Sequence, residues 1–207
     1  MAEESKIKWV YSSKSKEDLE QRYDQWAGDY DSDLTAGFDY RSPQRATELF
    51  ARYVPRDARV LDAGAGTGLV GEILAGMGYR NLVAMDLSRG MLEEARKKSV
   101  YTELHRMVMG EPLDFPTASF DAVISVGVLT VGHAPASSLD ELVRITRPGG
   151  HVVYTLRPDV YEKDGFREKH AELEAAGKWR PVEVSEPFQG TPRGEPDIFV
   201  RVWVFRV

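Results

Sequence analysis

The chain has 207 residues, of which 42% are hydrophobic and 29% charged, with a net charge of −6 and no cysteine. This composition predicts a globular protein of one domain and excludes disulfides, thiolate nucleophiles and cysteine-bound metals. The acidic balance disfavours nucleic acid as a partner, and no apolar run approaches the roughly 20 residues of a membrane span. Since the start also lacks a signal-peptide pattern, we expect a cytoplasmic monomer or homodimer that binds no metal, membrane or nucleic acid.

Two helices are expected before the first strand. Residues 1–15 are polar and are expected to be loose. Residues 16–30 carry apolar and aromatic side chains at helical spacing. Residues 42–53 begin with Ser42 as an N-cap and Pro43 in the first turn, which predicts a second helix.

Strands and helices then alternate along the chain. Strands are expected over 58–63, 81–86, near 104–109, 119–126 and 151–156, and helices over 67–77, 88–98, 136–146 and near 164–177. Residues 182–188 and 198–206 resemble two final strands. Repeated βα units predict an α/β fold with a mostly parallel sheet and helices on both faces. Ligands of such sheets bind beyond the carboxyl ends of the strands, where Asp62, Asp86 and Ser125 stand.

The stretch from Val60 to Gly68 reads as a strand, an acid and a glycine loop. Glycines let a backbone approach a ligand closely, and the following helix N-terminus offers N–H groups. A dinucleotide site requires Gly-x-Gly-x-x-Gly/Ala, but this chain has Leu69 at the last position. A nicotinamide-dependent oxidoreductase is therefore a disfavoured alternative. Gly-x-Gly-x-Gly after an acid resembles the first motif of the class I S-adenosylmethionine (SAM)-dependent methyltransferases.

Three further segments carry the same resemblance. Asp86, 22 residues after Gly64, can bind both hydroxyls of a ribose, although it could instead cap the next helix. Gly110–Glu111 stands where a small–acidic pair flanks adenine in that family, and Leu142–Gly150 is similar to its Leu-x-Arg-x-Leu-x-Pro-Gly-Gly segment. Upstream, residues 23–34 resemble the methyltransferase-like proteins named after the Williams–Beuren syndrome critical region.

The resemblance implies a Rossmann-like sheet of seven strands, mostly parallel, with an antiparallel C-terminal hairpin. Residues 46–207 would form the core of a single domain, and residues 1–45 a helical lid over the cofactor and acceptor. The implied cofactor is SAM, with S-adenosyl-L-homocysteine (SAH) as product. The residues expected to bind it are Tyr23, Trp26, Tyr30, Asp62, Gly64, Ala65, Gly66, Thr67, Gly68, Asp86, Leu87, Met91, Gly110, Glu111, Ser125 and Val126.

The aromatic residues of the lid have a physical reason to be near the cofactor. A sulfonium cation is attracted to aromatic faces by about 0.5–2 kcal/mol. Tyr23 and Trp26 stand at helical spacing, however, and could simply pack against the sheet.

The best candidate for a general base is His133, because an imidazole with a pKa near ~6.5 can accept a proton at neutral pH. An exposed histidine in a loop is the alternative. This chain also departs from the family, many members of which carry histidine nearer the strand, where Thr130 and Val131 stand here. Tyr11 and Arg157 are expected to line the acceptor pocket, with Arg157 placed to bind a carboxylate.

The predicted function is methyl transfer from SAM to an oxygen or nitrogen of a small-molecule acceptor by in-line displacement. Two alternatives stay open. A protein methyltransferase would have an open, acidic acceptor groove, and a SAM-binding protein would have no catalysis of its own.

Overall fold

The computed structural model describes residues 6–130 and 132–207, and its centre is one twisted sheet. The parallel strands are β1 (Arg59–Ala63), β2 (Asn81–Asp86), β3 (Glu103–Arg106), β4 (Phe120–Ser125) and β5 (Thr146–Leu156). β8 (Phe199–Arg206) runs antiparallel to β5 and to its other neighbour β6 (Arg180–Val184), which gives the order β3-β2-β1-β4-β5-β8-β6. The short β7 (Phe188–Gln189) pairs with β8 and adds an eighth strand to the seven that were predicted. The predicted mostly parallel sheet with an antiparallel C-terminal hairpin is confirmed. The strand order reverses between β1 and β4, which is where such sheets bind ligands.

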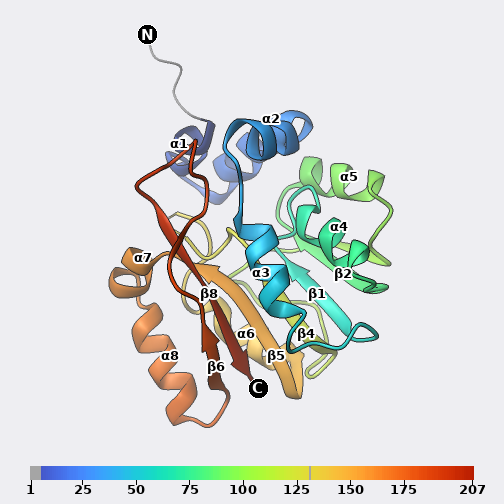
Figure 1. The fold of residues 1–207 in the computed structure, drawn as a ribbon, viewed down its shortest axis with the longest axis vertical. Coiled ribbons are helices and arrows are strands. Elements are labelled where there is room, and N and C mark those ends of the chain that lie inside the picture. Colours follow the sequence, from blue (N-terminus) through green and yellow to red (C-terminus); the bar gives the residue numbers. More distant parts are fainter. Residues whose placement is uncertain (1–5, 131) are drawn as a thin grey trace.

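Helices cover both faces of the sheet (Figure 1). On one face, α3 (Ser42–Phe50) and α4 (Leu69–Gly76) pack apolar side chains onto Val60 and Val204, and α5 (Arg89–Lys97) lies beside α4. On the other face, α6 (Ser138–Ile145) and α8 (Phe166–Ala175) cover Val123 and Tyr154, with α7 (Pro158–Lys163) next to α8. Because neighbouring side chains on a strand point to opposite faces, each central strand serves both cores.

The first described residues correct one prediction. Residues 1–15 were expected to be loose, but α1 (Lys6–Tyr11) is a helix whose Ile7 and Val10 are buried. The apolar side of α1 packs against α2 (Lys16–Ser32), whose N-cap is Ser15. The segment is polar on average, which concealed the short amphipathic pattern of α1. Residues 1–5 lie outside the described part of the chain.

Other differences lie at element ends. The helix expected near 164–177 is preceded by the separate helix α7, and Gly165 at φ 81° stands between α7 and α8. The expected strand 182–188 is divided between β6 and β7. The strand expected over 151–156 begins earlier, at Thr146, and the register of this longer β5 against β4 shifts in its first part. Left-handed glycines and bulges decide these details, and periodicity alone does not reveal them.

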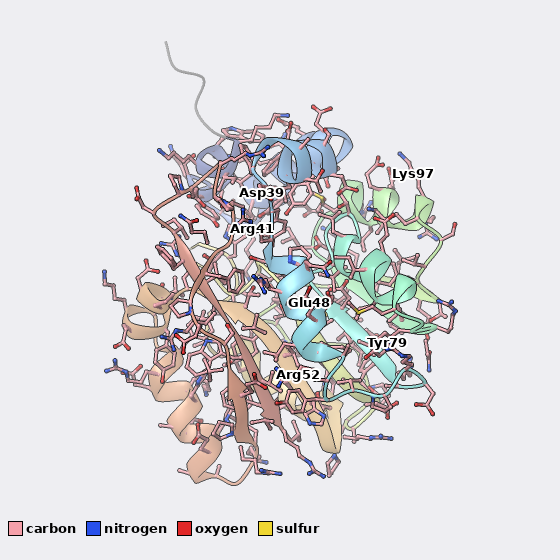
Figure 2. All side chains as sticks on the ribbon, in the orientation of Figure 1. Asp39, Arg41, Glu48, Arg52, Tyr79 and Lys97 are labelled. Carbon is pink, nitrogen blue, oxygen red and sulfur yellow. The ribbon has the colours of Figure 1, made fainter. Side chains whose placement is uncertain are left out.

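The N-terminal helices lie at one end of the molecule, and the β7–β8 connection reaches the same end (Figure 1). Asp24 of α2 accepts hydrogen bonds from the Ser88 hydroxyl (2.5 Å) and the Gly90 N–H (2.9 Å) at the start of α5. A π-helical turn, η1 (Asp33–Gly37), follows α2. In Figure 2, Asp39 and Arg41 mark the segment from this turn to α3, where they form an ion pair of 2.6 Å. Several polar contacts thus hold α2 over the carboxyl ends of the strands.

Candidate active site

A cleft lies between α2 and the carboxyl ends of β1, β2 and β4. It encloses about 750 Å³, counting the space open to solvent. Nine residues that the sequence assigned to the site line it: Tyr23, Tyr30, Gly64, Gly66, Asp86, Leu87, Met91, Val126 and His133. The other lining residues were not predicted: Lys16, Leu19, Met85, Met107, Val108, Met109, Gly127, Val128 and Ala134.

The glycine loop brings backbone to the cleft wall where a side chain has no room. A Cβ on Gly64, whose φ is 78°, would lie 2.2 Å from a methyl group of Val128. Two residues later, the N–H of Gly66 donates to Asp86 Oδ2 over 2.8 Å. The loop and the end of β2 are therefore one hydrogen-bonded unit.

Asp86 is almost fully buried at the end of β2. Its Oδ1 accepts from the Ser88 N–H at 2.9 Å, and its Oδ2 accepts from Gly66. Burial raises the pKa of the carboxyl, while backbone donors act in the opposite direction. Ser88, and not Asp86, caps α5, because its hydroxyl accepts from the Met91 N–H at 3.0 Å. The carboxylate thus keeps lone pairs for a ligand in the cleft.

Asp62 is the last residue but one of β1, beneath the glycine loop, and does not line the cleft. Its Oδ2 accepts from the Tyr101 hydroxyl at 2.6 Å, whereas its buried Oδ1 has no hydrogen-bond partner in the described part of the chain. Burial raises its pKa from 3.8 to about 7. The sequence did not identify Tyr101 as a residue near the site. The signal was Gly71 in the helix after the glycine loop, because its missing side chain leaves room for the Tyr101 ring.

Replacing Gly71 with alanine should disturb this pair. A Cβ there would lie 2.2 Å from the Tyr101 ring and hydroxyl, so the ring must move away from Asp62. Overpacking of this kind costs about 1–3 kcal/mol, which urea unfolding would measure. The matched control is Gly76→Ala in the same helix, where nothing lies within 4 Å, and which should stabilise slightly. Equal stability of the two variants would contradict the steric argument.

The remaining residues assigned to the cofactor lie behind or beside the cleft. The Thr67 hydroxyl donates to Asp31 of the N-terminal helices, and Ser125 Oγ donates to the Ala63 carbonyl at 2.8 Å. Neither of them lines the cleft, and nor do Ala65 and Gly68. The structure thus gives the hydroxyls of Thr67 and Ser125 partners within the protein.

The predicted small–acidic pair also lies outside the cleft. Glu111 is exposed and forms an ion pair with Lys16 at 2.6 Å, and a Cβ on Gly110 would meet the Pro135 ring at 2.9 Å. The wall at this point is formed by the preceding residues 107–109. The role of the pair beside adenine, which the family resemblance implied, stays a prediction.

A second chamber of about 720 Å³, measured in the same way, adjoins the cleft. Tyr23, Tyr30 and Gly127 line both spaces, so they form the boundary between them. Trp26, Tyr11 and Arg157 line the second chamber only. The Arg157 Nε and Nη2 atoms already bind Asp159, at 3.0 and 2.7 Å.

His133 lies near this boundary. Its Nε2 is 2.8 Å from the Tyr23 hydroxyl, and the Tyr11 ring meets it edge to face at 5.3 Å. The side chain is half-buried between the loop after β4 and the N-terminal helices. Val131, in the same loop, lies outside the described residues.

Within residues 6–130 and 132–207, no three or more histidine, aspartate or glutamate side chains are grouped so that they could hold a metal ion. Over the same residues, every helix is too short or too polar to cross a bilayer.

Comparisons with known proteins agree on one family. A family model described as a methyltransferase domain matches residues 61–154. Human methyltransferase-like protein 27 is 38% identical over 164 residues, which is 76% of this chain and 66% of that protein. A demethylmenaquinone methyltransferase of Clavibacter sepedonicus is 42% identical over 98 residues, 46% of this chain and 39% of that protein. The chain thus spans just under two thirds of the human relative and less of the bacterial one.

The fold is similar to a crystal structure of a SAM-dependent methyltransferase from Thermotoga maritima. The TM-score is 0.64 at 18% identity, and the match covers 89% of this chain and 97% of that one. At this identity the likeness concerns the fold.

Proposed function

Because this chain belongs to the class I SAM-dependent methyltransferases, we propose that it transfers a methyl group from SAM to an oxygen or nitrogen of a small-molecule acceptor by in-line displacement. The observation that carries this proposal is the pair of adjoining chambers, which share Tyr23, Tyr30 and Gly127 as their boundary. A donor and an acceptor on the two sides of this boundary would meet there. Such positioning supplies much of the rate of a displacement at carbon.

SAM is the cofactor of this family, and it supplies a methyl group on a sulfonium with a good leaving group. The residues of the first cleft fit it. Asp86 offers a buried carboxylate to the ribose hydroxyls, and the apolar wall of residues 107–109 suits a flat base. Behind the cleft wall, the buried carboxyl of Asp62 lies beneath the glycine loop with its Oδ1 unpartnered in the described part of the chain, and its negative charge would favour the ammonium of the amino-acid part across that loop.

The N-terminal residues act, in this proposal, as a lid. Tyr23 and Tyr30 close the cleft from α2, and their rings lie 6.3 Å apart. The polar contacts of Asp24 and of Asp31 fasten α2 to the start of α5 and to the glycine loop. Covered in this way, the reacting groups are shielded from water, and the aromatic faces favour a cation.

His133 is proposed to accept the proton of the acceptor. Tyr23 donates to or accepts from its Nε2, so the ring is held at the boundary of the two chambers. Replacing His133 with glutamine should lower kcat by about 10²-fold or more while the affinity for SAH stays within a factor of about three. Tyr23→Phe removes one contact and should have a smaller effect on kcat.

The test is a transfer assay with SAM labelled in its methyl group against a panel of small amines, phenols and carboxylic acids. A labelled product that depends on His133 would support the proposal. Binding of SAH without transfer to any of these acceptors, but with transfer to proteins of a cell extract, would instead support a protein methyltransferase.

A further inference from the structure

The second chamber, which we call the acceptor chamber, is walled mainly by rings and aliphatic side chains. Its aromatic residues are Tyr11, Tyr23, Trp26, Tyr30 and Tyr40. They come from three separate N-terminal segments and face the end of β5 and the β7–β8 connection. A ligand of matching chemistry therefore has an apolar body.

Two charged side chains line the acceptor chamber, and they are not equivalent. Arg157 already donates two hydrogen bonds to Asp159, whose charge compensates its own. The sequence placed Arg157 to bind a carboxylate, but the Nε–Nη2 edge of its guanidinium, one of the edges that can bind a carboxylate bidentately, is already occupied by Asp159. This position therefore offers a ligand little net positive charge.

Glu195 is the charge that remains. It is half-buried, and within the described part of the chain neither Arg157 nor Lys8, the two cations that act on it, forms an ion pair with it. Burial raises the pKa of its carboxyl. Glu195 therefore presents a carboxylate that accepts no hydrogen bond from residues 6–130 or 132–207.

The loop that carries Glu195 is held against the N-terminal part of the chain. The Glu195 N–H donates to the Thr191 carbonyl at 2.8 Å, and the Arg193 N–H donates to the Phe38 carbonyl at 3.2 Å. A Cβ on Gly194 would lie 2.9 Å from the Phe38 ring, so the contact is close. These contacts give the carboxylate a defined place in the chamber wall.

We propose that the acceptor chamber takes an organic amine, whose ammonium binds Glu195 while its aromatic or aliphatic body lies among the tyrosine and tryptophan rings. Aromatic faces attract cations and disfavour anions, so the rings and the carboxylate select the same charge. This inference rests on the proposed function only in taking the second chamber as the acceptor site.

The test uses phenethylamine and 3-phenylpropionate, which share a phenyl ring and a two-carbon chain but have opposite charges. Calorimetric titration of the SAH-saturated protein should show the amine binding at least tenfold more tightly than the carboxylate. Glu195→Gln should weaken the amine about tenfold and leave the affinity for SAH unchanged. The matched control Asp197→Asn removes an exposed charge two residues away and should leave both probes unaffected.

Three results would overturn the inference: equal or tighter binding of 3-phenylpropionate, an unchanged amine affinity in Glu195→Gln, or binding of neither probe. Failure of SAH itself to bind would contradict the proposed function separately. The same titrations without SAH would then still decide whether the chamber prefers the amine.

Discussion

Replacing Asp86 with alanine should lower the affinity for SAH about 100-fold or more. The carboxylate accepts from the Gly66 and Ser88 N–H groups and has lone pairs left for the ribose hydroxyls. Hydrogen bonds to a charged group contribute about 1.5–3 kcal/mol each, so the loss of two of them gives a change of this size. Calorimetric titration with SAH measures it directly.

The control for this variant is Asp114→Ala. Asp114 also follows a strand of the sheet along the chain, but its carboxylate is exposed and does not line the cleft. Its removal should leave the affinity for SAH within a factor of about two. An Asp86→Ala protein that folds and binds SAH as the parent does would exclude this cleft as the ribose site.

Replacing Asp62 with asparagine should have two effects. It should stabilise the cofactor-free protein, and it should weaken the binding of SAM. Asp62 is fully buried, and one of its oxygens has no partner in the part of the chain that the structure describes. An uncharged amide of the same shape avoids the cost of burying the charge. It also removes the negative charge that suits the SAM ammonium, so the affinity for SAM should fall about tenfold or more.

The stabilisation should depend on pH in a defined direction. The pKa of Asp62 is about 7 in the folded protein against an ordinary 3.8, so between these values the folded state holds a proton that the unfolded state releases. The free energy of unfolding therefore falls as pH rises from about 4 to 7, by up to about 4 kcal/mol for this group. The increase in the free energy of unfolding caused by Asp62→Asn should therefore be near zero at pH 4 and greatest at pH 8. Urea unfolding of the cofactor-free protein at the two pH values measures it.

A second aspartate provides the contrast. Asp121 accepts from the Arg59 N–H at 2.6 Å and forms an ion pair with Arg147 at 2.6 Å. Because its charge is compensated, Asp121→Asn should destabilise the protein at pH 8. Destabilisation by Asp62→Asn at the same pH would show that the buried carboxylate is not strained in the way the structure indicates.

The sequence predicted the sheet and the core of the site from local patterns. The glycine loop, the acid at the end of β2 and the alternation of strands and helices each lie within a short stretch, and the family prediction made from them is confirmed. The position of Asp86 at the cleft follows from the same reasoning, since carboxyl ends of parallel strands meet at one edge. Motifs of this kind are local in the chain, so one sequence is enough to find them.

Only the tertiary structure decided which distant segments meet. Tyr101 beneath Asp62, residues 107–109 in the cleft wall, and Glu195 opposite the tyrosines of the N-terminal helices all depend on loops that pack against other elements. The helix at Lys6–Tyr11 exists because its apolar side packs against α2. A short helix is not stable alone, and the path of a loop is set by packing and not by the spacing of residues. Local patterns in the sequence therefore determined the scaffold and the cofactor motif. Long-range packing determined the acceptor chamber.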